Sequence, residues 1–309
     1  MSIDLSTMPR LVEAARTGNL VPFIGAGISR QAKTSDPHAF PAWPELINEM
    51  AARALYLRRI TPDEKDELKE LVRRGKHLMA AQHLKEKLQG EYYQVIRDRF
   101  EPIDAEPGAI HKALFRLKAP LIVTTNYDCL LEDAYAKEFS GRAKTVTFKR
   151  APEVIAFLQR REQYQHPLIF KIHGTVENAE EVVLAEQDYR TLIYREPGYR
   201  TVLSAIFVTK VVLMLGFSFT DPELTVLTES IRESLKHRMT PDFIVLPEGS
   251  RGSVEKHRLH EDFGLHVIEY SEKDEHAELL ELIEQLAKAV PANVSASEVV
   301  QSTGSTLTV

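Results

Sequence analysis

Six short aliphatic or β-branched runs stand out along the chain and predict six strands. They are apolar throughout instead of alternating with polar residues, which is typical of strands buried on both faces of a parallel sheet. The runs lie at Leu20–Ile24, Leu121–Thr124, Leu168–Ile172, Val211–Phe217, Phe243–Pro247 and Leu265–Tyr270.

Between these runs the apolar positions recur with the period of a helix. Leu46, Ile47, Met50 and Ala54 form one such stripe, and another runs from Leu279 to Val290 before Pro291 ends it. Alternating strands and helices predict an α/β fold with a Rossmann-like, doubly wound and mostly parallel sheet.

One part of the chain interrupts this alternation. From about residue 42 to 117 only helical patterns occur, which predicts a helical module inserted into a domain that spans residues 1–290. Arg58–Lys76 is its most charged stretch, and the mixture of acids and bases there favours a solvated helix face over a nucleic-acid patch. Residues 291–309 are rich in Ser, Thr and Val, which predicts a flexible tail or a weak partner-binding strand.

Composition and charge exclude several classes of protein. Of the 309 residues, 39 are Lys or Arg and 45 are Asp or Glu, and the net charge of −6 gives no field for wrapping nucleic acid or coating an anionic membrane. One cysteine, Cys129, excludes an internal disulfide and a four-cysteine zinc site. With neither a secretory signal nor a membrane-spanning run, we expect a soluble cytoplasmic protein.

The first candidate for chemistry is the turn Gly25–Ser29 after the first predicted strand. Its two glycines allow the backbone to approach a phosphate closely, and the Ser29 hydroxyl could add a donor. A dinucleotide fingerprint wants a third glycine where Arg30 stands, so the match is partial. The alternative is a tight turn that binds nothing.

Three further segments place polar residues at the carboxyl ends of predicted strands, where open α/β sheets bind ligands. Thr125–Asp128 offers Asn126, although Asn126 or Asp128 could equally cap a helix. His173, followed by Gly174, is a candidate general base, since the unperturbed pKa of histidine lies near neutrality. The segment Gly216–Asp221 again ends a strand with Gly and Ser. These segments would converge on one rim of the sheet.

In these motifs, together with Tyr189, the sequence resembles the sirtuin superfamily of NAD-consuming proteins, and in particular its bacterial branch in antiviral defence. The resemblance implies that Asn126 holds the nicotinamide ribose and a water, and that His173 is the general base. It implies further contacts to NAD: Gly25, Ala26, Gly27 and Ser29 at the diphosphate, Thr125 in the same set, Asp128 near the nicotinamide amide, Gly216 and Ser218 at the adenosine, and Tyr270 beside the adenine.

Two departures from deacylating sirtuins shape the expected activity. The zinc cysteines are missing, and an extra segment of about Lys137–Pro167 puts the acyl-lysine groove in doubt. Water is then the expected acceptor, so we expect an NAD hydrolase that forms nicotinamide and ADP-ribose without a metal. Replacing His173 by Ala should abolish turnover with little loss of folding. The alternatives are an NAD-dependent deacylase and a non-catalytic NAD or ADP-ribose sensor.

The resemblance also implies how such an enzyme is restrained, because uncontrolled loss of NAD would kill the host. We expect a homo-oligomer, or activation by a partner such as a DNA-translocating ATPase, an Argonaute-like protein or a phage component. No direct contact with nucleic acid or membrane is expected.

Overall fold

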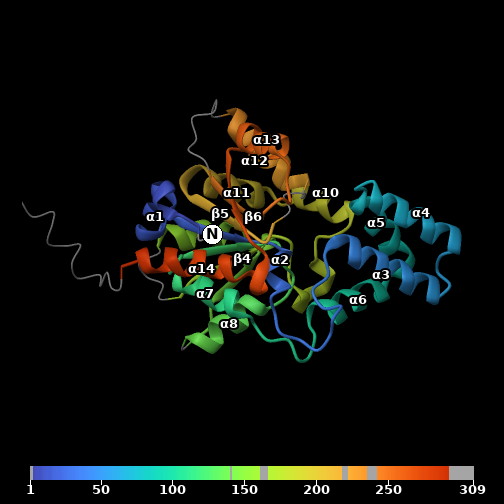
Figure 1. Cartoon of the computed structure of the whole chain (residues 1–309). Helices are drawn as coiled ribbons and strands as arrows, with labels where there is room; N and C mark the ends of the chain where they lie inside the picture. The colour runs from blue at the N-terminus through green and yellow to red at the C-terminus, as the bar shows by residue number, and fades with distance from the viewer. Residues whose placement is uncertain (1–2, 140, 161–165, 218–221, 235–241, 292–309) are drawn as a thin grey trace, which may run out of the picture.

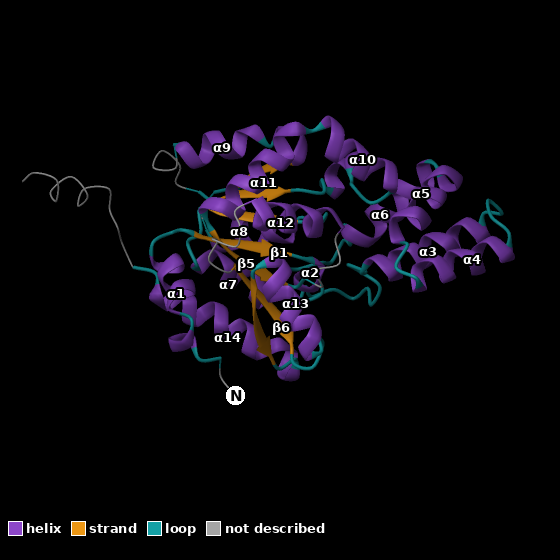
Figure 2. Cartoon of the chain, turned by 90° about the horizontal axis from the view of Figure 1, so that it is seen from above, coloured by secondary structure: helices purple, strands orange, loops and turns teal. Residues whose placement is uncertain are grey.

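Within the part of the chain that the structure describes, seven strands form a single parallel sheet in the order β3-β4-β2-β1-β5-β6-β7 (Figures 1 and 2). The computed structural model describes residues 3–139, 141–160, 166–217, 222–234 and 242–291. The Rossmann-like fold class and all six predicted strands are confirmed. The strands are β1 (Leu20–Ile24), β2 (Leu121–Thr124), β3 (Lys144–Thr147), β4 (Leu168–Lys171), β5 (Val211–Leu215), β6 (Asp242–Pro247) and β7 (Leu265–Tyr270).

Helices cover both faces of the sheet and also form a separate group at one end of it. The α-helices of the described residues are α1 (Pro9–Arg16), α2 (Ala26–Ser29), α3 (Trp43–Tyr56), α4 (Pro62–Arg73), α5 (His77–Leu88), α6 (Gly90–Phe100), α7 (Ala109–Arg116), α8 (Leu130–Glu138), α9 (Pro152–Gln159), α10 (Glu186–Arg195), α11 (Pro197–Thr209), α12 (Pro222–Ser234), α13 (Ser253–Phe263) and α14 (Lys273–Ala289). Short 3₁₀ helices occur at Leu5–Thr7, Phe148–Arg150 and Val176–Glu181.

Alternate residues of each central strand feed two different cores. In β1, Val21 and Phe23 pack with residues of α9 to α13, whereas Leu20 and Ile24 pack with residues of α1, α7, α8 and α14. Successive side chains of a strand point to opposite faces, so a strand buried on both faces has to be apolar throughout. This explains why the central strands were recognisable from the sequence.

Strand β3 was not predicted. It lies at the edge of the sheet beside β4, and Val146 is its only fully buried residue. An edge strand needs few apolar residues, because one flank and much of its surface face solvent. Strand β3 and helix α9 both lie within the extra segment of about residues 137–167.

Helices α3 to α6 form the inserted module, which projects from one end of the sheet domain (Figures 1 and 2). They share a core of their own that also takes up Tyr127 from the loop after β2. The rings of Phe100 and Tyr127 meet edge to face at 5.1 Å. Helix α7, which the expected insertion of about residues 42–117 included, instead packs with α8 and α14 against the sheet.

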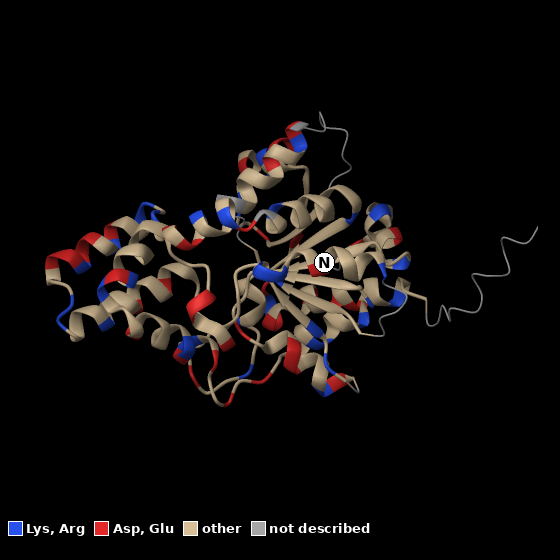
Figure 3. Ribbon diagram, turned by 180° about the vertical axis from the view of Figure 1, so that it is seen from behind, with Lys and Arg blue, Asp and Glu red and all other residues tan. Residues whose placement is uncertain are grey.

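The charged surface of the module follows the expectation for solvated helices. Acidic and basic positions are mixed along its helices (Figure 3), and Glu70 pairs with both Arg73 and Arg74 within α4. None of the helices in the described part of the chain is both long and apolar enough to cross a membrane. The tail, residues 292–309, lies outside the described residues.

The position of β1 determines where a ligand site can form. From β1 the sheet continues through β2 on one side and through β5 on the other. Such a switch point opens a crevice outside the carboxyl ends of the strands. The turn after β1 lies there, between the loops after β2 and β4 and the loops after β5, β6 and β7.

Candidate active site

The glycine turn after β1 packs tightly against the loop after β5. The Gly25 N–H donates to Leu215 O at 2.9 Å, and the Gly27 N–H donates to Gly216 O at 3.0 Å. A Cβ on Gly25 would lie 2.6 Å from Gly216 O, and Gly216 itself has a φ of +68°. The two loops can therefore approach each other only because these positions are glycines. This agrees with the alternative interpretation of the segment as a structural turn. The Gly27 N–H already has a partner within the protein.

Asn126 follows β2 and reaches across to this turn. Its Nδ2 donates to Gly25 O at 3.0 Å and to Ser29 Oγ at 2.7 Å. Both N–H donors of the amide are thereby used. The amide nitrogen faces Gly25 and Ser29, so the amide oxygen points away from these two residues. Asn126 Oδ1 is buried and has no hydrogen-bond partner among the residues that the structure describes. A buried acceptor in this state is costly unless a ligand or water uses it.

Ser29 and Asp128 complete a buried network around Asn126. The Ser29 hydroxyl donates to Asp128 Oδ2 at 2.6 Å, and Asp128 Oδ1 accepts from the Leu130 N–H at 3.1 Å, at the start of α8. The N-cap position of α8 is Cys129 and not Asp128, but the Asp128 carboxylate does accept the first N–H of the helix. The side chains of Ser29 and Asp128 are turned toward the protein, and their assignments to the diphosphate and the nicotinamide amide stay predictions.

His173 follows β4, the strand beside β2, and so lies next to the Asn126 loop. The two strand ends are joined by the Ile172 N–H, which donates to Thr124 O at 2.9 Å. The His173 side chain is only 2% exposed, and its ring packs against the Tyr189 ring at 5.4 Å. The expectation that a histidine at a strand end contributes little to the core is therefore wrong.

Aromatic side chains from three helices cover the His173 side of the site. Tyr189 of α10 meets Trp43, the first residue of α3, with their ring centres 6.0 Å apart. Trp43 in turn meets His77, the first residue of α5, at 6.0 Å. The sequence did not single out Trp43 or His77, because their role depends on how the inserted module packs against α10.

A cavity of about 420 Å³ opens on the other side of the glycine turn, at the carboxyl ends of β5, β6 and β7. Gly27, Gly216 and Tyr270 line it, as do Arg30 and Arg251. Burial, followed by the charge of Glu272, raises the pKa of Tyr270 to about 12. The phenol therefore stays protonated, and it forms a 2.9 Å hydrogen bond with His276 Nδ1. Ser218 lies outside the described residues.

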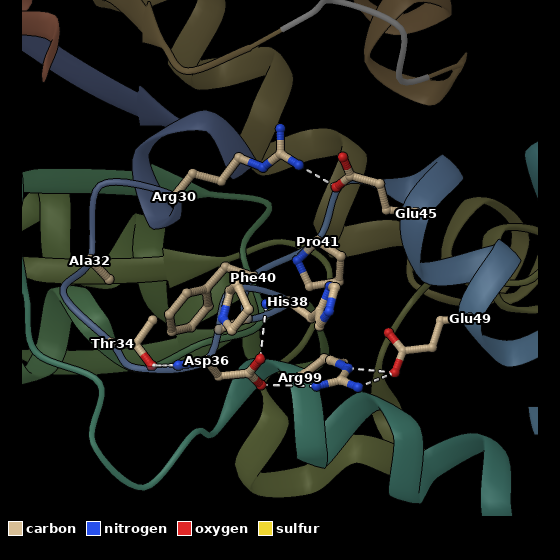
Figure 4. Close-up of a pocket in the computed structure, with 12 residues that line it drawn as sticks. Arg30, Ala32, Thr34, Asp36, His38, Phe40, Pro41, Glu45, Glu49 and Arg99 are labelled. Carbon is tan, nitrogen blue, oxygen red and sulfur yellow. Dashed lines mark hydrogen bonds and ion pairs between the residues drawn. The ribbon is translucent and has the colours of Figure 1, made fainter.

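A larger cavity of about 780 Å³ lies between the loop after α2 and the module (Figure 4). Arg99 crosses its floor, paired with Glu49 and with Asp36. Arg30 pairs with Glu45 at the opposite wall, and Arg30 also lines the first cavity. Arg30 appeared in the sequence only as the residue that breaks the glycine fingerprint. Across the described ranges no cluster of three or more His, Cys, Asp or Glu side chains could hold a metal ion.

Residues 120–268 match the family described as SIR2-like domain. This range includes Asn126, His173 and Gly216, whereas the Gly25–Ser29 turn lies before it. The match, together with the relatives below, confirms the resemblance to sirtuin-like proteins of the defence branch.

Three curated relatives illustrate this similarity. NAD(+) hydrolase ThsA of Enterococcus faecium is 27% identical over 243 residues, which cover 77% of this chain and 45% of the relative. NAD(+) hydrolase ThsA of Bacillus cereus (strain MSX-D12) is 30% identical over 163 residues, covering 52% and 32%. Defense-associated sirtuin 2 of Bacillus subtilis is 24% identical over 266 residues, covering 84% and 24%. The chain thus spans less than half the length of these relatives.

Proposed function

From the match to the SIR2-like domain, we propose that this chain hydrolyses NAD to nicotinamide and ADP-ribose, as an NAD-depleting effector of bacterial defence against phage. The relatives named NAD(+) hydrolase and defense-associated sirtuin support this assignment. The structural observation that carries it is the Asn126 amide. Its oxygen is a buried, preoriented acceptor without a partner among the described residues, and it lies at the strand end next to that of His173.

The chemistry of the substrate explains why such a pair is useful. When the bond between the ribose C1′ and the pyridinium nitrogen breaks, its electron pair goes to that nitrogen and nicotinamide leaves as a neutral molecule. The ribose is left with an oxocarbenium-like charge, so the protein has mainly to orient the sugar and its acceptor. Asn126 Oδ1 would accept a hydrogen bond from a ribose hydroxyl or from the attacking water.

His173 would act as the general base. Water forms its bond to C1′ and gives up a proton, which the imidazole takes, and ADP-ribose results. General-base assistance of this kind contributes roughly 10²–10⁴-fold. The cavity beside Gly27 and Gly216 would receive the adenosine half, and its volume of about 420 Å³ lies within the usual range of roughly 300–1,000 Å³ for ligand sites.

The burial of the catalytic pair supports a restrained enzyme. Asn126 is 8% exposed and His173 is 2% exposed, and Tyr189 packs on the His173 ring. Movement of this cover would give a ribose access to both side chains. We therefore propose a cytoplasmic protein that is switched on by homo-oligomer assembly or by a protein partner, and that uses NAD as substrate without a metal.

Product analysis tests the proposal directly. NAD is incubated with the wild type over a range of protein concentrations, with the Asn126→Ala variant, and with Asn19→Ala as a control at an exposed asparagine away from this rim. We expect nicotinamide and ADP-ribose from the wild type and the control, and a loss of about 10²-fold or more in Asn126→Ala.

Other outcomes would point to the alternatives. Transfer of an acyl group from an acetyl-lysine peptide to ADP-ribose would favour the deacylase. Tight binding of NAD with no turnover in any of the conditions would favour the sensor and contradict hydrolysis.

A further inference from the structure

Lys171 is the most deeply buried charged side chain near the site. It is the last residue of β4, two positions before His173, and it is 0% exposed. Lysine is almost never fully buried unless it is paired, because removing its charge from water is costly. The chain therefore needs compensating partners for Lys171 at this strand end.

Among the described residues, these partners lie on the segment that follows Asn126. Lys171 Nζ donates to the backbone oxygen of Asp128 and, at 3.1 Å, to Glu132 Oε1 in α8. Burial acts to lower the pKa of Lys171, but the carboxylate of Glu132 and other nearby groups outweigh it and raise the pKa. The lysine is thus a buried cation that joins the end of β4 to the turn between β2 and α8.

A continuous series of hydrogen bonds leads from this turn to the catalytic amide. The Asp128 carboxylate accepts the Ser29 hydroxyl proton at 2.6 Å. Since that proton is committed, Ser29 Oγ acts as an acceptor for Asn126 Nδ2, at 2.7 Å. The amide nitrogen therefore faces Ser29 and Gly25, and the amide oxygen faces the opposite way. Asp128, acting through Ser29, therefore sets the orientation of Asn126 together with the carbonyl oxygen of Gly25.

We propose that Lys171, with Glu132, is a positioning residue for Asn126: it fixes the turn that carries Asp128, and through Asp128 and Ser29 it aims the amide oxygen at the substrate. This role rests on the proposed hydrolysis of NAD. Lys171 itself touches no reacting atom. Its loss should therefore reduce kcat and leave KM for NAD nearly unchanged.

The test separates positioning from stability. Lys171→Met alone leaves Glu132 without its cation and will destabilise the fold, so it is paired with the double variant Lys171→Met/Glu132→Leu, which buries no unpaired charge. Glu132→Gln is a milder, nearly isosteric third variant. Lys144→Met is the matched control, because Lys144 begins the neighbouring strand β3 and pairs at the surface with Glu153. Thermal unfolding and steady-state cleavage of NAD are measured for each.

We expect the double variant to recover most of the melting temperature that Lys171→Met loses, yet to keep a kcat about 10- to 100-fold below that of the wild type, with KM changed less than about threefold. Glu132→Gln should lower kcat by about threefold, and Lys144→Met should change neither constant.

A wild-type kcat in the folded double variant and in Glu132→Gln would overturn the inference. If the double variant does not fold, the kcat of Glu132→Gln decides alone. A wild type that leaves NAD intact overturns the proposed function itself, and the role of Lys171 with it, so the two failures are distinguishable in one assay.

Discussion

The two sides of the rim around the glycine turn are built differently. On the side of β2 and β4, the side chains of Asn126, Ser29, Asp128 and Lys171 are buried and hydrogen-bonded to one another or to neighbouring groups, whereas Asn126 Oδ1 has no partner among the described residues. On the side of β5, β6 and β7, a cavity of about 420 Å³ is lined by glycines, arginines and the aromatic residues Phe217 and Tyr270, among others. The first arrangement holds a few atoms rigidly, and the second leaves room for a ligand.

This difference indicates that the two sides of the switch point can have separate roles, with the reacting groups on the β2–β4 side and ligand binding on the β5–β7 side. Buried polar networks are rigid when fully satisfied, which suits the placement of reacting groups. Exposed cavity walls can form new contacts with a ligand at little cost. Substitutions on the β2–β4 side should therefore act on kcat, and substitutions on the β5–β7 side should act on KM.

The largest expected effect is that of His173→Ala. Loss of the general base should lower kcat by about 10²–10⁴-fold. Because the ring is 2% exposed and packs on Tyr189, we also expect a loss of stability of about 1–2 kcal/mol. Steady-state kinetics and urea unfolding measure both, with the exposed His260→Ala as control. A variant that keeps the wild-type kcat would remove His173 from the chemistry.

A smaller effect is expected on the binding side, at the ion pair of Arg30 and Glu45. Arg30 lines both cavities and would exchange Glu45 for the diphosphate of NAD. Arg30→Ala should raise KM by about three- to tenfold with kcat within about twofold, whereas Glu45→Gln should lower KM slightly, because it frees the guanidinium. A change in kcat without a change in KM in Arg30→Ala would contradict the assignment of substrate binding to the β5–β7 side.

The pH dependence of stability is expected to come from a group outside the site, so it can be separated from any pH dependence of catalysis. Asp242 lies at the start of β6, and burial raises its pKa from 3.8 to about 7, although the Val212 N–H and the charge of Arg10 oppose the shift. Between about pH 4 and pH 7 the folded state holds a proton that the unfolded state has released. Stability should therefore fall as pH rises through this range and then level off.

Asp242→Asn removes this titrating group and should therefore flatten the dependence of the free energy of unfolding on pH. Across the range, the change in this free energy should differ between variant and wild type by an amount on the order of 1.4 kcal/mol for each unit by which the pKa is shifted. Urea unfolding of both proteins at several pH values between 5 and 8 measures it. Parallel curves for variant and wild type would contradict the assignment. Any pH dependence of kcat that persists in Asp242→Asn belongs to the site.

Much of the fold could be predicted because the central strands are buried on both faces and have to be apolar. The edge strand β3 could not, since only Val146 needs burial there. The approach of Asn126 to the His173 strand also followed from the sequence, because carboxyl ends of parallel strands share one edge. The hydrogen bonds that hold the Ser29 and Asp128 side chains inside the protein could not be predicted, since they join two loops that are far apart in the sequence.

The central claim is most directly tested by a crystal structure of the His173→Ala variant with NAD bound. We predict the adenosine in the cavity lined by Gly216 and Tyr270, and the nicotinamide ribose, or a water beside its C1′, within hydrogen-bond distance of Asn126 Oδ1. A dinucleotide bound elsewhere would contradict the proposed role of Asn126. So would one bound in this cavity with its ribose away from Asn126 Oδ1 and that oxygen hydrogen-bonded to the protein.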